Sequence, residues 1–171
     1  MDKGLMTALA MALVAAAPAA RPVLLLAGDG VGVGARTIKF DRTTRAQAIA
    51  LVTTALGPPV KQGNHGDCAQ DAIRYYAAFR GDFELTFVGG KFVGWTEDGT
   101  TLHTAKGIAV GSTLAAVRRA YPDVETDEGD EANGGLGASF QREDGPQGWL
   151  DGTRPTSKVI GLYAGVTCIV S

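Results

Sequence analysis

Histidine, aspartate and cysteine come closest together in the polar segment 60–71, which contains His65, Asp67 and Cys68. A thiol nucleophile needs a base that meets it in space and a third group that orients the base. Neighbours on one short glycine-containing loop rarely meet in that way, and oxidation of Cys68 would remove the nucleophile. We therefore interpret this segment as a surface loop and assign no catalytic residue to the chain.

Metal-binding patterns are also missing from the sequence. Zinc needs three or four suitably spaced ligands, whereas this chain has 2 His, 2 Cys and no C-x-x-C. The acidic segment 123–135 suggests calcium, but a calcium loop beginning at Asp123 would place Glu128 where glycine is needed and Gly134 where glutamate is needed. We expect a solvated acidic loop and no metal.

A glycine-rich segment near the N-terminus has the spacing of a dinucleotide-binding turn at Gly30, Gly32 and Ala35. Such a turn must open a helix, but residues 37–40 have the alternation of a strand. We interpret residues 21–36 as a flexible leader, and we expect no cofactor.

Aromatic side chains are the remaining candidates for a site, because they dominate binding surfaces when a sheet face is exposed. Tyr75 alternates in phase with Phe79 and is expected in the core, whereas Tyr76 points the other way. A possible binding face therefore comprises Tyr76, Trp95 and Trp149, with burial of these rings in the core as the alternative.

The first twenty residues predict export. One lysine precedes an apolar run over 5–17, and small residues follow at Ala17 and Ala19, as in a secretory signal peptide. The run is shorter than the roughly 20 residues of a membrane-spanning helix, so we expect cleavage and no span in the mature chain, with a retained anchor as the alternative. We expect a secreted, periplasmic or cell-envelope location.

Composition restricts the classes of partner. A net charge of −2 and a pI near 5.6 provide no basic surface for nucleic acid. Export would place Cys68 and Cys168 in an oxidising compartment, where one disulfide between them is expected, although two separate thiols remain the alternative.

Two segments predict helices with defined ends. Thr44 and Gln47 form a capping box before an apolar stripe at Ile49, Val52 and Leu56, and Gly57 can end this helix. The second helix begins after Ser112 or Thr113 and ends before Pro122, and its apolar stripe is Leu114, Val117 and Tyr121.

Alternating apolar residues predict strands after each helix, at 73–79, 83–87 and 91–96, and again at 138–141, 149–150 and 158–163. We therefore expect an α+β fold made of two tandem helix-plus-antiparallel-meander repeats, 37–103 and 104–171, with both helices on one face of the sheet.

Four short segments carry a family resemblance: LGPP at 56–59, FVGW at 92–95, GIAVGSTLAAVRRAYP at 107–122 and the late Cys168. In this order they resemble a group of exported bacterial proteins of unassigned function. The expected plan is similar to that of the β-lactamase inhibitory proteins and of the small lipoprotein of the outer-membrane barrel assembly machinery. The resemblance implies binding of other proteins without an active site, and it transfers no contact residue.

These observations favour an exported, non-catalytic binding protein for a protein or cell-envelope component. The first alternative is a small hydrolase or small-molecule-binding protein that uses the open sheet face. The second is a structural envelope module. A contiguous aromatic patch would favour binding, whereas a deep pocket with convergent polar groups would favour an enzyme.

Overall fold

The computed structural model describes residues 20–66, 73–129 and 137–167, and its fold is mostly β. Twelve strands form one eight-stranded and one four-stranded sheet, with two short helices. The expected α+β fold of two helix-plus-meander repeats is therefore wrong. Apolar alternation predicted the central strands, but it did not reveal the polar strands at the sheet edges or a whole second sheet.

The eight-stranded sheet has the order β4-β5-β6-β7-β12-β11-β10-β9, and its neighbours all pair antiparallel. Its strands are β4 (Lys61–His65), β5 (Arg74–Phe79), β6 (Phe83–Val88), β7 (Lys91–Glu97), β9 (Glu125–Asp127), β10 (Ser139–Gln141), β11 (Gln147–Leu150) and β12 (Val159–Gly165). The six predicted strands are confirmed within a few residues. The edge strands β4 and β9 were missed because they are almost entirely polar.

The four-stranded sheet has the order β3-β2-β1-β8, from β1 (Leu24–Ala27), β2 (Gly30–Val33), β3 (Arg36–Lys39) and β8 (His103–Thr104). Residues 21–36, which we expected to be a flexible leader, thus contain β1, β2 and the start of β3. Val31 and Val33 alternate with the glycines that suggested a turn, and both valines are buried. The alternation of β2 therefore serves a core and not a phosphate-binding loop.

The helices begin where the sequence predicts. α1 (Arg45–Leu56) carries the complete Thr44–Gln47 capping box, and α2 (Leu114–Ala120) is capped by the Thr113 hydroxyl, which accepts from the Ala116 amide at 3.1 Å. Gly57 has φ of +84° at the end of α1, a conformation that glycine adopts without strain.

The buried faces of the two helices agree unequally with the predicted stripes. Leu114, Val117 and Tyr121 are buried as expected. The buried side of α1 is instead formed by Ala48, Leu51, Val52 and Ala55, and Ile49 and Leu56 are only half-buried. The small alanines let α1 approach its neighbours closely, so its contact side is rotated by part of a turn from the stripe of large residues.

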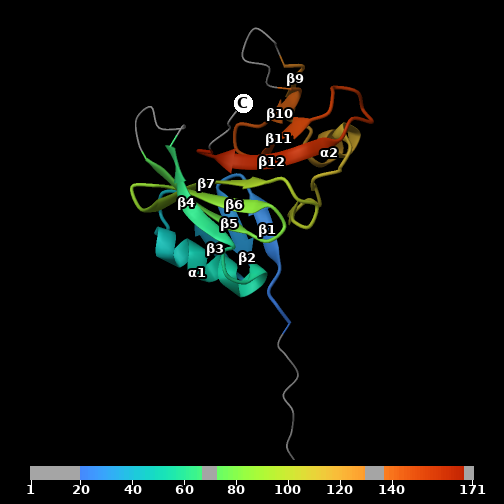
Figure 1. Cartoon of the computed structure of the whole chain (residues 1–171). Coiled ribbons are helices and arrows are strands. Elements are labelled where there is room, and N and C mark those ends of the chain that lie inside the picture. The colour runs from blue at the N-terminus through green and yellow to red at the C-terminus, as the bar shows by residue number, and fades with distance from the viewer. Residues whose placement is uncertain (1–19, 67–72, 130–136, 168–171) are drawn as a thin grey trace, which may run out of the picture.

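One core lies between the layers. Figure 1 shows α1 and the small sheet on the same side of β4 to β7, and α2 beside β10 to β12. The indole nitrogen of Trp95 in β7 donates to the carbonyls of Ala27 at 2.9 Å and Gly30 at 3.0 Å, in the β1–β2 turn. Trp95 therefore joins the two sheets at the centre of the core.

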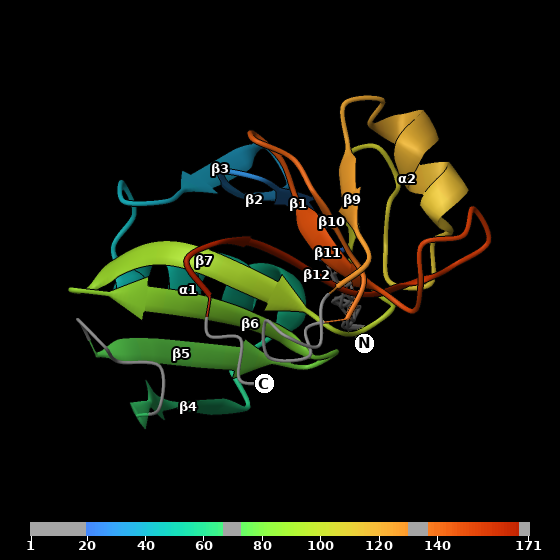
Figure 2. The same cartoon turned by 90° about the horizontal axis from the view of Figure 1, so that it is seen from above.

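Because side chains alternate along a strand, the eight-stranded sheet has two distinct faces. We call the side that carries Phe83, Leu85 and Trp95 the core face, and the opposite side the open face. In the described part of the chain, no helix or strand packs on the open face, but the segment 166–167 crosses its centre beside Gly94 and Arg74, and Thr86 is buried there. The sheet twists so strongly that β9 to β11 rise out of the plane of β4 to β7 (Figures 1 and 2).

Some predictions fall on residues that the structure does not describe. These are the signal peptide, of which only residue 20 is described, and both cysteines of the expected disulfide, Cys68 and Cys168. Among the described residues, no helix has the length and apolar character needed to cross a membrane.

Candidate functional site

The strand registers place two of the three predicted binding residues on the open face. Tyr76 in β5 lies opposite Thr86 in β6, and Trp149 in β11 lies opposite Gly161 in β12. Four strand spacings separate β5 from β11, or about 19 Å along the sheet. Both rings are half-buried, so they offer apolar area to a partner without lying in the core.

At the β4 end of the open face, Tyr76 belongs to a packed polar group. The His65 ring stacks on Tyr76 with centroids 4.5 Å apart, and its Nε2 lies 2.8 Å from Glu84 Oε1. The Lys61 ammonium lies 5.8 Å from the centre of the Tyr76 ring. Gly63 makes the stacking possible, since a Cβ there would lie 3.0 Å from the tyrosine ring. This end is fixed in shape and carries the Lys61 cation at its surface.

At the β11 end, Trp149 stacks on Tyr163 with centroids 5.3 Å apart and ring planes 26° apart. Tyr163 is the buried member of this pair, and its burial raises the pKa of its hydroxyl. Gln147 lies directly opposite Tyr163 and therefore on the same face as Trp149. The stacked pair gives the open face a rigid aromatic platform bordered by an amide.

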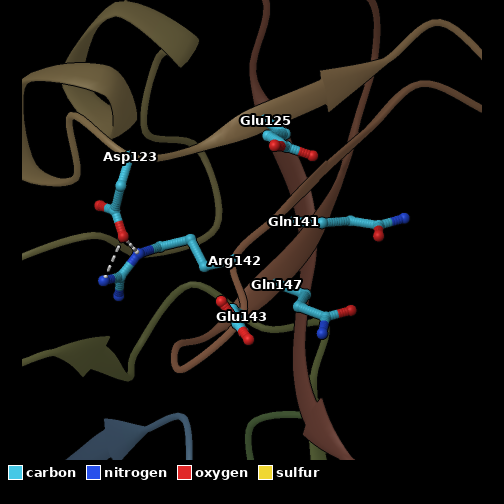
Figure 3. Close-up of a pocket in the computed structure, with 6 residues that line it drawn as sticks. All are labelled: Asp123, Glu125, Gln141, Arg142, Glu143 and Gln147. Atoms are coloured by element: carbon cyan, nitrogen blue, oxygen red, sulfur yellow. Dashed lines mark hydrogen bonds and ion pairs between the residues drawn. The ribbon is translucent and has the colours of Figure 1, made fainter.

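A polar hollow of about 490 Å³ adjoins this platform. Figure 3 shows the residues that line it, which come from β9, β10, β11 and the segments that flank them: Asp123, Glu125, Gln141, Arg142, Glu143 and Gln147. Gln141 and Gln147 contribute amides, and Glu125 and Glu143 contribute exposed carboxylates. The hollow therefore presents mainly acceptors, with the side-chain amides as additional donors.

Arg142 is paired with neighbouring side chains and is not free to bind a ligand. Its Nε and Nη2 atoms donate to Asp123 Oδ2 at 3.0 and 2.8 Å, and this pairing lowers the pKa of Asp123. Its guanidinium also lies 4.6 Å from the centre of the Tyr121 ring, which Lys106 flanks at 4.8 Å. Arg142 thus braces the wall of the hollow, and the unpaired charges there are the glutamates.

The geometry offers little support for catalysis. His65 and Glu84 form a histidine–carboxylate pair, but no Ser, Thr or Cys hydroxyl or thiol hydrogen-bonds His65 within the described ranges. A nucleophile needs such a bond to its base. The described residues also contain no group of three His, Cys, Asp or Glu side chains arranged to hold a metal ion.

Trp95 is the predicted binding residue that the structure places elsewhere. It lies opposite Leu85 and Ala164 on the core face and is 0 % exposed. Tyr75, which we predicted to be buried in the core, is instead partly exposed. It does point to the core face, but it lies near the outer end of β5, where it is 37 % exposed and packs under Arg45. Strand parity predicted its direction, and position along the strand decided its exposure.

Sequence reasoning missed Gln141, Gln147 and Tyr163, which complete the site around Trp149. One signal was available, because Gln147 is two residues before Trp149 and must share its face in a strand. Tyr163 could be placed only by the pairing of β11 with β12, which the sequence does not specify.

Comparison with known proteins gives the fold alone. No family model matches the chain, and no curated protein matches it. A similar solved structure is the uncharacterized protein yfeY from Escherichia coli, with 11 % sequence identity and a TM-score of 0.51, over 85 % of this chain and 97 % of that one.

Proposed function

We propose that this chain is an exported, non-catalytic binding protein whose partner, a protein or another component of the cell envelope, docks on the open face. The observation that carries the proposal is the pair of stacked aromatic groups on that face, Tyr76 with His65 and Trp149 with Tyr163. Aromatic anchors of this kind supply much of the binding energy at protein interfaces. The signal-like N-terminus supports export.

The shape of the open face favours a partner that protrudes. Strands β9 to β11 stand up from β4 to β7 (Figure 1), so a projecting loop or domain would reach both aromatic groups better than a flat surface. Lys61 lies at one end and Glu125 with Asp127 at the other, on strands that form the two sheet edges. Such a charge distribution orients a partner more than it strengthens binding.

A second candidate is binding of a small molecule in the hollow beside Trp149. Its volume of about 490 Å³ lies in the range of ligand pockets. Its lining of glutamates and glutamines suits a cationic or hydroxyl-rich molecule. The hollow is open and polar, however, whereas most small-molecule sites are largely apolar.

Affinity capture on the immobilised full chain tests the proposal, with an envelope extract as the source of partners. We expect a specific partner to be retained by the unchanged chain and to bind at least roughly tenfold more weakly to Tyr76→Ser/Trp149→Ser, because both anchors are lost. The matched control is Tyr75→Ser, which removes a partly exposed tyrosine from the other face of the same strand. Equal loss in Tyr75→Ser, with unchanged melting temperatures, would contradict docking on the open face.

A further inference from the structure

Glu97, the last residue of β7, is a carboxyl group inside the core. It lies opposite Phe83 in β6 and Leu162 in β12, and its side chain is 0 % exposed. Neither carboxyl oxygen has a hydrogen-bond partner among the described residues. A buried polar group without a partner costs free energy, and an ionised one costs far more. Natural sequences replace such residues unless the group has a use.

The groups around Glu97 make its ionised form worse. Asp98 in the following loop and Asp82 in the β5–β6 turn both add negative charge, while β6 and β12 present apolar side chains. The pKa of Glu97 is raised to about 8, mainly by burial and to a smaller extent by the two aspartates. The Leu102 backbone amide lowers this pKa in part, but it does not meet the geometry of a hydrogen bond.

The loop 98–102 closes directly over this carboxyl. A Cβ on Gly99 would lie 1.9 Å from the Gly81 carbonyl oxygen and 3.1 Å from Glu97 Oε1, so only glycine allows this approach. The Asp98 amide donates to the Asp82 carbonyl at 3.1 Å. This loop and the β5–β6 turn therefore separate Glu97 from water.

The same loop leads to the weakest strand pairing of the small sheet. β8 has two residues, and it pairs in parallel with β1 through Leu25 with His103 and Leu26 with Thr104. Opening of the loop would expose Glu97 to water and would remove the support of β8. The protonation state of Glu97 is thus coupled to the pairing of β8, the edge strand of the small sheet, with β1.

We propose that Glu97 is a proton-dependent latch: with its proton the loop 98–102 stays closed over the core, and loss of that proton opens the loop and releases β8 from β1. An ionised Glu97 is unfavourable among Phe83, Leu162 and two aspartates, and it becomes favourable once water reaches it. The latch is closed in neutral and acidic conditions and opens as the pH becomes alkaline. The latch does not require a partner on the open face.

Amide hydrogen exchange of residues 98–104 in the full chain tests the latch between pH 5.5 and pH 8.5, corrected for the intrinsic pH dependence of exchange. With a pKa shifted from 4.5 to about 8, the opening equilibrium constant should rise roughly a hundredfold from pH 5.5 to pH 8. The variants Glu97→Gln and Glu97→Met should remove that rise, because neither side chain ionises. Two variants are used because one of them could fail to fold.

Glu128→Gln is the control, since Glu128 is an exposed carboxylate directly after the edge strand β9, four strands from β7, and its loss should leave the rise unchanged. An equal rise in Glu97→Met, or exchange of residues 98–104 that is never faster than exchange of the central strands β5 to β7 at the same pH, would overturn the latch. Rescue of slow exchange at pH 8.5 by either Glu97 variant supports it.

Discussion

Two Gly-Trp dipeptides, 94–95 and 148–149, lie in the two halves of the eight-stranded sheet, and their indoles point to opposite faces. Trp95 is fully buried and bonded to the β1–β2 turn, whereas Trp149 is half-buried on Tyr163. The glycine before each tryptophan faces the side opposite to the indole, and each is in close contact there. A Cβ on Gly94 would meet the Val166 carbonyl at 2.1 Å, and one on Gly148 would meet the Phe140 ring at 2.5 Å on the core face.

The comparison continues two residues further along each strand. Trp95 is followed on the same face by Glu97, which is buried without a partner, and Trp149 is followed by Asp151, which is exposed and accepts from the Lys158 amide at 2.7 Å. The β4–β7 half therefore holds the central core and Glu97, the one buried acid among the described residues, whereas the β9–β12 half stacks its tryptophan on Tyr163 at the open face. The same local sequence places one tryptophan in the core and the other half-buried on the open face.

The largest expected difference is between the two tryptophans themselves. Trp95→Ala should lower the free energy of unfolding by about 3 to 5 kcal/mol, because it leaves a cavity and two carbonyls without a donor. Trp149→Ala should cost less than about 1.5 kcal/mol. Urea unfolding of both variants measures the difference, and similar losses would show that the two halves are equally committed to stability.

The next effect distinguishes the two acids by pH. The pKa of Glu97 is raised from 4.5 to about 8, so the folded chain binds one more proton than the unfolded chain between these values. The stabilisation is complete below pH 4.5 and is lost as the pH rises through about 8. The free energy of unfolding should fall by about 3 to 4 kcal/mol from pH 5 to pH 8.

Glu97→Gln should flatten this dependence, and Asp151→Asn should leave it unchanged. Urea unfolding at several pH values from 5 to 8 provides the measurement. A slope that survives in Glu97→Gln would assign the pH dependence to another group.

Part of this arrangement was accessible from the sequence. The helix caps were predictable because the side chains of Thr44, Gln47 and Thr113 bond to amides only three residues away. Such local contacts can be predicted from the sequence alone. The strands around Phe83 and Trp95 were equally legible from their alternation. The absolute face of each strand was not, because Trp95 and Trp149 share one local pattern and differ only in their neighbours.

The rest depends on contacts between distant segments. The sheet of β1 to β3 is held in place by Trp95 and by β8, which lie 65 to 78 residues further along the chain. The three strands that line the hollow, β9 to β11, neighbour one another in sequence order, but their half of the sheet joins β7 through β12, its last strand, and not through β9. No pattern within a single segment records that order.

Smaller effects are expected at the helix starts of the two halves. Thr44→Ala and Thr113→Ala should each lower the free energy of unfolding by about 1 kcal/mol, since each removes one acceptor for a helix amide. Gln47→Ala should add a loss in the α1 half alone, because residue 116 is alanine and provides no reciprocal bond. Thermal unfolding of the three variants checks this. A Gln47→Ala variant with unchanged stability would show that only the Thr44 hydroxyl stabilises the start of α1, as the Thr113 hydroxyl does for α2.

The smallest effect is expected at the wall of the hollow. Asp123→Asn removes the partner of Arg142 at a site exposed to solvent, where ion pairs contribute little. The melting temperature should stay within experimental error of that of the unchanged chain. A large drop in melting temperature would show that the β9–β12 half depends on this pair for its fold.

The bonds from Trp95 to Ala27 and Gly30 give the molecule a built-in optical reporter. The chain has only two tryptophans, so a Trp149→Phe variant would emit from Trp95 alone. Its fluorescence would shift to longer wavelength when the small sheet leaves the indole, before the rest of the core unfolds. Stopped-flow refolding followed at that wavelength would therefore time the docking of residues 24–39 onto a sheet formed by residues that follow them.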